Sequence, residues 1–142
     1  MKPVSEMLIL VDDDELFRSA LAANLREDGY EVLEYASGRA IALDRLSGVE
    51  ALLTDYHMAD EDGLHLADRF HAAMPRVPIV IMSAFAPAYL ESAVADRRYA
   101  TLLPKPLDYE ELRAVLENAI TAAFSAPAAP AAGRSPRASG AT

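Results

Sequence analysis

The sequence predicts an α/β domain built on a doubly wound, five-stranded parallel sheet with five helices. Short apolar runs alternate five times with segments of helical periodicity along most of the 142 residues. The apolar runs are nearly continuous, which is typical of strands that are buried on both faces of a parallel sheet. Because right-handed crossovers place helices on both faces of such a sheet, the alternation indicates the doubly wound arrangement.

The five expected strands are short segments dominated by aliphatic side chains. We expect them at residues 7–11, 31–35, 51–55, 78–83 and 101–103. The second strand alternates only weakly between apolar and polar residues, whereas the fourth is almost entirely apolar. The fourth strand is therefore expected near the centre of the sheet, where both of its faces are covered.

Five helices are expected between and after these strands. Their ranges are residues 15–28, 37–48, 62–74 and 87–97, followed by a last helix whose apolar positions run from 112 to 123. Ser37, Asp62 and Asp108 are the expected caps of the second, third and last helices. Gly48 is expected to end the second helix, because glycine is favoured just after a helix.

The overall composition excludes several classes of protein. Hydrophobic residues make up 52% of the chain, which indicates a globular domain. The absence of cysteine excludes disulfides and thiolate metal sites. The net charge of −9 argues against a nucleic-acid-binding surface, because phosphate binding needs clustered Lys and Arg.

The two ends of the chain differ from the predicted domain. Residues 1–11 contain an apolar run of only five residues, which is too short for a signal peptide or a membrane span. We therefore expect a cytoplasmic protein with no membrane contact. Residues 125–142 are rich in Ala, Pro, Ser, Gly and Arg and lack periodicity. We expect residues 1–124 to form one domain and residues 125–142 to be a disordered tail or a truncated linker.

Polar residues follow four of the expected strands. Asp12 and Asp13 come after the first strand, Asp55 ends the third, Ser83 ends the fourth, and Lys105 follows the fifth. The carboxyl ends of parallel strands meet in one crevice. Two carboxylates about 4 Å apart there repel by about 4 kcal/mol at an effective dielectric constant near 20, which favours a bound hard cation such as Mg²⁺ or Mn²⁺. With a hydroxyl and an ammonium group added, such a site can hold a phosphoryl group.

Each of these residues also has an ordinary structural explanation. Asp12 and Asp13 could complement the dipole of the following helix, which is worth roughly 0.3–1 kcal/mol. Asp55 and Ser83 could begin turns, and Lys105 could be a solvated surface lysine. The occurrence of all these residue types at four strand ends favours a functional site over separate structural roles.

The motifs at these strand ends are specific as a set. They are Val11-Asp12-Asp13-Asp14, Asp55 with Met58 and Asp62-Gly63-Leu64, Ser83-Ala84, and Lys105-Pro106. Together they resemble the receiver domain of two-component response regulators, over about residues 6–124 and at all five active-site positions of that family. The resemblance implies a flavodoxin-like sheet with strand order 2-1-3-4-5.

The resemblance implies a phosphoryl-acceptor site. Asp55 would accept a phosphoryl group from the phosphohistidine of a sensor histidine kinase or a phosphotransfer protein. Asp13 and Asp55 would bind Mg²⁺, or Mn²⁺, with help from Asp12 through water and from the main-chain carbonyl of His57. No turnover of an external substrate is implied, so the domain is not expected to be an enzyme.

The resemblance also implies roles for residues on the fourth and fifth strand ends. Ser83 would hydrogen-bond one phosphoryl oxygen, and Lys105 would pair with another. The Lys105-Pro106 peptide bond would be cis. Phe85 and His57 are candidates for tuning the dephosphorylation rate, although His57 is equally explained as a solvent-exposed loop histidine.

Several residues depart from the family pattern. Leu102 occupies the switch position, where many members have a Tyr or Phe that rotates inward upon phosphorylation. Ala59 replaces a common proline, and Asp96-Arg97-Arg98 replaces part of the usual Gly-Ala-Asp-Asp run. Pro104 removes a strand donor, which is tolerable on an edge strand. We expect these changes to affect the output of the domain more than its phosphoryl chemistry.

Two other functions compete with the receiver prediction. A pseudo-receiver would be a protein-interaction module that takes up no phosphate; the altered switch position favours it, and the five filled site positions count against it. A Mg²⁺-dependent phosphohydrolase with an aspartate nucleophile usually has a second Asp two residues later, where this chain has His57. For a receiver, the expected partners also include a downstream protein or a missing output domain, and a homodimer through the last two helices.

Overall fold

The computed structural model describes residues 7–125, in which strands and helices alternate along the chain. The strands are β1 (Met7–Val11), β2 (Glu31–Tyr35), β3 (Val49–Asp55), β4 (Ile79–Ser83) and β5 (Ala100–Pro104). The helices are α1 (Glu15–Glu27), α2 (Gly63–Ala73), α3 (Ala88–Asp96) and α4 (Tyr109–Ser125). The tail or linker predicted for residues 125–142 lies outside the described residues, except that Ser125 still belongs to α4.

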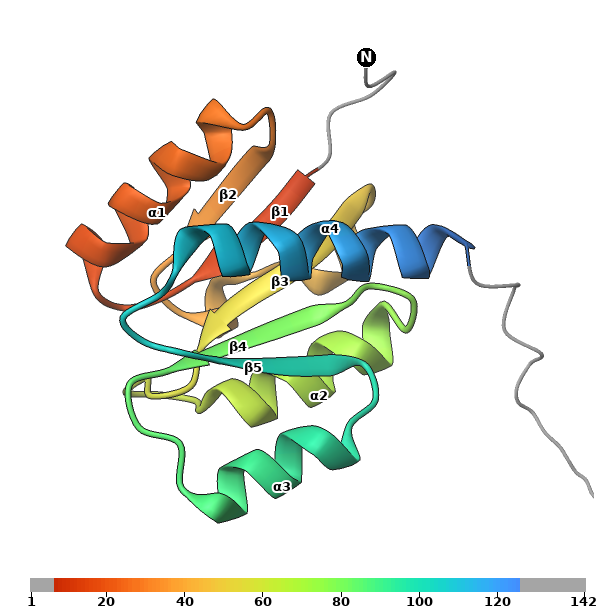
Figure 1. Ribbon diagram of the computed structural model, residues 1–142. Coiled ribbons are helices and arrows are strands. Elements are labelled where there is room, and N and C mark those ends of the chain that lie inside the picture. Colours follow the sequence, from red (N-terminus) through yellow and green to blue (C-terminus); the bar gives the residue numbers. More distant parts are fainter. Residues whose placement is uncertain (1–6, 126–142) are drawn as a thin grey trace, which may run out of the picture.

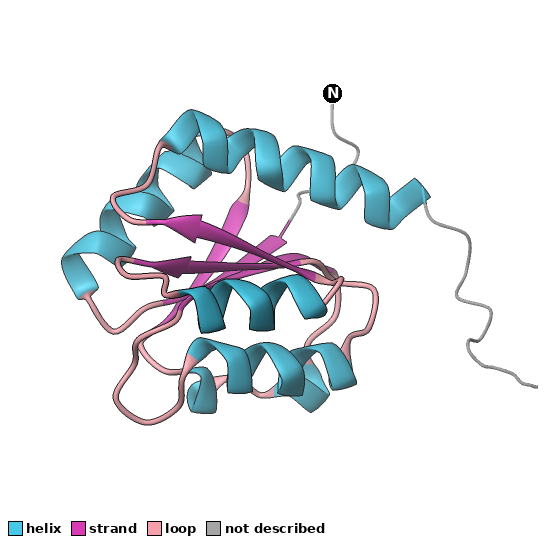
Figure 2. Ribbon diagram, turned by 60° about the horizontal axis from the view of Figure 1, so that its bottom comes forward, coloured by secondary structure: helices cyan, strands magenta, loops and turns pink. Residues whose placement is uncertain are grey.

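All five strands pair in parallel, in the order β2-β1-β3-β4-β5. This order confirms the one implied by the family resemblance, and it makes β5 an edge strand. Helices α1 and α4 cover one face of the sheet, and α2 and α3 cover the other (Figures 1 and 2). As a result, β1 and β3 are neighbours near the middle of the sheet, and their carboxyl ends lie side by side.

The sheet separates two hydrophobic cores. Side chains alternate along each strand, so Leu8 and Leu10 pack toward α1 and α4, while Ile9 and Val11 pack toward α2 and α3. All four of these β1 side chains are fully buried. Continuous apolar strands are thus explained by burial on both faces, as the sequence indicates.

The prediction of a second helix at residues 37–48 is wrong, and the described residues contain four α-helices in place of the predicted five. The segment forms two short 3₁₀ turns, Gly38–Ala40 and Leu43–Arg45. Its apolar residues Ile41, Leu43 and Leu46 are spaced by two and then three positions, so they cannot share one face of an α-helix. An extended backbone at Ile41, with φ −80° and ψ 126°, lets them all pack toward the α2 and α3 side of the sheet.

The predicted caps Asp62 and Asp108 are confirmed, whereas Ser37 caps a short 3₁₀ turn in place of the predicted helix. The Ser37 hydroxyl accepts a hydrogen bond from Arg39 N, although it caps a 3₁₀ turn. The Asp62 carboxylate accepts one from His65 N, which begins α2. The Asp108 carboxylate accepts hydrogen bonds from Glu110 N and Glu111 N, the second and third residues of α4. No helix within residues 7–125 combines the length and the apolar character that are needed to cross a membrane.

Candidate functional site

Three carboxylates meet at the carboxyl ends of β1 and β3. Asp12 and Asp13 follow β1 directly, and Asp55 is the last residue of β3. One carboxylate oxygen from each lies within 4.8 Å of the others. Asp12 and Asp55 are buried, with 1% and 6% of their surface exposed, whereas Asp13 is open to solvent. The structure therefore brings together the three acids that the sequence placed at one crevice.

Lys105 supplies the positive charge of this cluster. Its Nζ lies 2.9 Å from an oxygen of Asp12 and 2.9 Å from an oxygen of Asp55. The main-chain N–H of Lys105 donates to the carbonyl of Ser83 (2.9 Å), and the peptide bond to Pro106 is cis, as the resemblance implies. The ammonium also lies 4.1 Å from the centre of the Phe17 ring, where a cation–π attraction adds to its restraint.

For both Asp55 and Lys105, burial shifts the pKa in one direction, and the contact between the two residues shifts it in the other. Burial raises the pKa of Asp55, the hydrogen bond from Lys105 lowers it, and the nearby charges of Asp12 and Asp13 raise it further, so the pKa lies above its ordinary value. Burial alone would lower the pKa of Lys105, but the hydrogen bonds to Asp55 and Asp12 outweigh that effect and raise it. The positive charge of Lys105 therefore does not fully offset the cost of ionising Asp55.

The donor set fits a hard divalent cation. Asp12, Asp13 and Asp55 offer only carboxylate oxygens, which Mg²⁺ and Mn²⁺ prefer over softer ligands. Three acids facing one ammonium leave a local excess of negative charge, which a cation would neutralise. The exposed side of Asp13 leaves a route for a hydrated ion to enter.

Ser83 ends strand β4, and the two tuning candidates, His57 and Phe85, lie on the loops that follow β3 and β4. Ser83 is buried at the end of β4, where its hydroxyl donates to the carbonyl of Phe85 (2.5 Å) and accepts from Phe85 N (3.2 Å). The Phe85 side chain is itself 67% exposed. His57 is exposed and contacts the Tyr56 ring edge-on, and both residues line a shallow pocket that also includes Asp13. His57 thus lies at the mouth of the acidic site.

Two further residues support the backbone of the acids: Arg18, which the sequence analysis did not identify, and Gly63, which it listed in a motif without predicting this contact. Arg18 in α1 donates to the main-chain carbonyl of Asp12 (2.7 Å) and to Glu34 at the end of β2 (3.1 Å). Gly63 begins α2 against the backbone of Asp55, and a Cβ there would lie 2.6 Å from the Asp55 carbonyl oxygen. The Asp-Gly pair at the helix start could have indicated this close approach. No local pattern could have indicated Arg18, because its contacts depend on how α1 packs beside β2.

Two groups of residues depart from the family pattern: Ala59 lines the same shallow pocket as Asp13 and His57, whereas Leu102 and residues 96–98 lie on the α3 and β5 side. Leu102 on β5 is half-buried and packs against the α2 and α3 core. Arg97, just after α3, forms a bidentate ion pair with Asp68 of α2 (2.8 and 3.0 Å). The hydroxyl of Tyr99 also donates to Asp68. Polar contacts of Asp68 with Arg97 and Tyr99 therefore connect the C-terminal end of α3 to α2.

Comparison with known proteins identifies the family. Residues 8–117 match the family described as the response regulator receiver domain. The chain is 37% identical over 116 residues to the transcriptional regulatory protein ZraR of Salmonella typhimurium, which covers 80% of this chain and 26% of that protein. It is 33% identical over 127 residues to the DNA-binding transcriptional regulator NtrC of Azospirillum brasilense, over 87% of this chain and 26% of that protein. The chain thus spans about a quarter of the length of these relatives.

Solved structures agree on the fold. A response regulator receiver domain protein, described as CheY-like, from Methanospirillum hungatei superimposes with a TM-score of 0.78. It covers 85% of this chain and 98% of that chain, at 18% sequence identity. The match to the family along 8–117 rests on the same segment that carries the acids, Ser83 and Lys105. This chain belongs to the response regulator receiver domain family of two-component systems.

Proposed function

We propose that this domain accepts a phosphoryl group on Asp55 from a phosphohistidine of a sensor histidine kinase or a phosphotransfer protein. The observation that carries the proposal is the contact of Lys105 with both Asp12 and Asp55, at 2.9 Å each, inside a cluster of three carboxylates. A carboxylate nucleophile, a cation site and fixed donors are the parts that phosphoryl transfer needs.

In the proposed reaction, a carboxylate oxygen of Asp55 forms a bond to phosphorus. The phosphorus–nitrogen bond of the donor phosphohistidine breaks, and its electron pair returns to the imidazole nitrogen. Lys105 and the Ser83 hydroxyl would each stabilise a phosphoryl oxygen, after the hydroxyl turns from the Phe85 carbonyl. Asp12, Asp13 and Asp55 would hold Mg²⁺, which when bound neutralises charge on the transferred group.

The exposed residues at the rim of the site are proposed to set how long the phosphoryl group persists. His57 is exposed and lines the pocket that includes Asp13, and Phe85 is exposed two residues after Ser83, whose hydroxyl contacts its main chain. The main-chain carbonyl of His57 is proposed to complete the cation site, and its side chain and that of Phe85 to control access of water. Replacing His57 with Ala should then change the dephosphorylation rate, and an unchanged lifetime of the phosphorylated form would contradict this part of the proposal.

The partners and output of the domain follow from the same proposal. The relatives named above are transcriptional regulators that are about four times as long as the matched segment. We propose that phosphorylation changes contacts with a downstream protein, an attached output domain or a second copy of this domain, and that the domain acts in the cytoplasm. Because Leu102 replaces an aromatic residue, these contacts would not be switched by an aromatic side chain on β5.

Phosphoryl uptake measured by intact-protein mass spectrometry tests the proposal. The protein is incubated with a small phosphodonor such as acetyl phosphate, with Mg²⁺ or with a chelator, and compared with Asp55→Asn. A single metal-dependent phosphoryl adduct that is absent from the variant is the expected result. A folded protein with no adduct under any condition would support a pseudo-receiver, and steady hydrolysis of a small phosphoester would support a phosphohydrolase.

A further inference from the structure

The loop between β3 and α2, residues 56–62, carries His57 and is attached to the domain at two separated places. At its inner end, Tyr56 N–H donates to the carbonyl of Met82 on β4 (2.8 Å). Gly63 N–H then donates back to the Tyr56 carbonyl (2.9 Å), which closes the base of the loop. These contacts fix Asp55 and Tyr56, but they do not reach the distal part of the loop.

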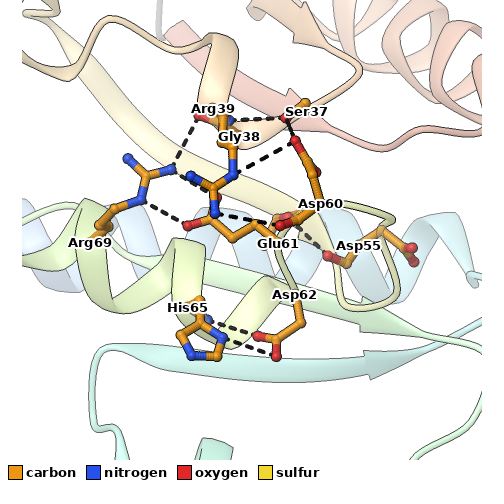
Figure 3. A network of polar contacts seen from close by, with 10 residues as sticks. Ser37, Gly38, Arg39, Asp55, Asp60, Glu61, Asp62, His65 and Arg69 are labelled. Atoms are coloured by element: carbon orange, nitrogen blue, oxygen red, sulfur yellow. Dashed lines mark hydrogen bonds and ion pairs between the residues drawn. The ribbon is translucent and has the colours of Figure 1, made fainter.

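The distal part is held by a buried carboxylate, Glu61, of which 8% is exposed. Arg69 on α2 forms a bidentate ion pair with Glu61: its Nε donates to one carboxylate oxygen and its Nη2 to the other, at 2.8 Å each. The same Nη2 lies 3.3 Å from the carbonyl of Gly38, in the turn after β2. Figure 3 shows the Glu61 and Arg69 side chains facing each other, with Gly38 beside the guanidinium.

The turn after β2 fits closely around this ion pair. Ser37 Oγ donates to the carboxylate of Asp60 (2.5 Å), so the neighbour of Glu61 is held by the same turn. A Cβ at position 38 would lie 2.7 Å from both methyl carbons of Leu66 and 3.1 Å from a carboxylate oxygen of Glu61. Glycine at position 38 lets the turn approach this closely, because a Cβ there would force the buried Leu66 side chain to shift.

We infer that Glu61 and Arg69 are positioning residues for the cation site: together with the turn at Gly38 they hold the loop that carries His57 over the acids. The inference rests on the proposed function, because it assigns the loop a part in holding Mg²⁺. Stability alone explains the pair poorly, because the Arg69 side chain is 40% exposed and ion pairs that stay open to solvent usually add little to stability. A carboxylate and guanidinium that fit in only one geometry instead restrict where the loop can lie.

The direct test is Mg²⁺ binding to the unphosphorylated protein, measured by isothermal titration calorimetry. Glu61→Met and Arg69→Met are each expected to raise the dissociation constant about three- to tenfold, less than the loss typical of residues that contact a metal ligand directly. Glu61→Gln keeps the volume and one acceptor, so a smaller effect in the same direction is expected. Gly38→Ala perturbs the same contact from the other side without changing any charge, and it should also weaken Mg²⁺ binding.

Two controls separate positioning from general destabilisation. Arg113→Met removes a similar 2.8 Å ion pair, with Glu110 on the surface of α4, and should leave Mg²⁺ affinity unchanged. Leu116→Ala should lower the melting temperature without changing Mg²⁺ affinity in the folded protein, because Leu116 lies in the core between the sheet and α4. Unchanged Mg²⁺ affinity in folded Glu61→Gln and Arg69→Met variants would overturn the inference.

Phosphoryl uptake provides a second measurement that distinguishes the inference from the proposed function. Uptake from acetyl phosphate by Glu61→Met should be slow at limiting Mg²⁺ and should approach the wild-type rate at saturating Mg²⁺. Equal Mg²⁺ dependence in wild type and variant would overturn the inference and leave the proposed function intact. If the wild type takes up no phosphoryl group but the variants bind Mg²⁺ more weakly, the proposed function fails and the positioning role stands.

Discussion

Two buried carboxylates, Asp12 and Asp55, share one ammonium group, and the charge that remains on them governs how the site responds to substitution. Lys105 reaches both acids, but the pKa of Asp55 is still raised, because burial and the charges of Asp12 and Asp13 outweigh its hydrogen bond. Binding of a cation, or replacement of one acid by a neutral side chain, should reduce this excess of negative charge. The cost of ionising Asp55 among these acids destabilises the folded domain, and a bound cation would offset that cost.

We predict that Asp55→Asn raises the free energy of unfolding at pH 7 in the absence of Mg²⁺. The pKa of Asp55 is raised in the folded state, so the cost of ionising it appears as pH rises above its ordinary value of 3.8 and is complete above the raised value. Mg²⁺ should reverse the order by stabilising the wild type, by about 2.7 kcal/mol at a hundredfold excess over the dissociation constant. Urea unfolding with and without Mg²⁺ measures both effects, and a less stable variant in chelator would contradict the prediction.

Most of the site residues were predictable from the sequence, and the supporting residues were not. Asp12, Asp55 and Lys105 follow apolar strands, and parallel strands bring their carboxyl ends to one edge whatever the helices do. Arg18 and Arg69 lie on helices and reach backbone carbonyls of the segments at residues 12 and 38. Those contacts depend on the packing of helices against distant turns, which no local pattern encodes.

A further prediction concerns acid. The hydrogen bond from Arg69 lowers the pKa of Glu61, so the stability that Glu61 contributes is present above its ordinary pKa of 4.5 and is lost as pH falls through the lowered value. The difference in unfolding free energy between wild type and Glu61→Gln should therefore be constant near neutral pH and shrink below about pH 4.5. Chemical unfolding at several pH values tests this, and a difference that grows toward low pH would contradict it.

At the scale of elements, regular spacing decides what the sequence can reveal. Helix α4 carries apolar residues at intervals of three and four, and it forms as predicted. The segment from 37 to 48 has glycine at both ends and an i, i+2 step between Ile41 and Leu43, so tertiary packing determines its shape. Its outer boundary is Gly48, which has φ of 75°, a conformation that glycine adopts without strain.

Substituting Gly48 with Ala should destabilise the domain by about 1–2 kcal/mol, the cost of the left-handed conformation for a residue with a Cβ. No atom lies within 4 Å of the position that the Cβ would occupy, so steric collision contributes nothing and the effect is purely one of backbone conformation. Thermal unfolding measures the loss. Ser47→Ala, at the exposed neighbouring position, serves as the control and should change stability by less than about 0.5 kcal/mol.

Helix α4 gives the complementary prediction, in which packing decides. Leu116 is fully buried between α4 and the sheet, so Leu116→Ala should lower the free energy of unfolding by about 2–5 kcal/mol. Glu117→Ala, one residue further and exposed, should change it by less than about 0.5 kcal/mol. Similar losses in both variants would mean that the helix is stabilised by its own propensity and not by its buried face.

For the whole molecule, the doubly wound arrangement was predictable because the sequence alternates between two kinds of periodicity five times, even though one connection turned out not to be a helix. The strand order came from the family resemblance, since the alternation fits several orders. The sheet keeps two cores apart, one under α1 and α4 and the other under α2 and α3. The acids lie where the two halves meet, above β1 and β3.

Lys105 is one of only two lysines in the sequence, the other being Lys2. Its side chain is 17% exposed and is bound to two carboxylates, so an amine-directed reagent such as an activated ester should modify it slowly. Competition for those carboxylates by a cation would free the amine, and a phosphoryl group would engage it again. The extent of modification of Lys105 can be measured by peptide mass spectrometry. It would therefore report whether a cation or a phosphoryl group occupies the site, without any engineered label.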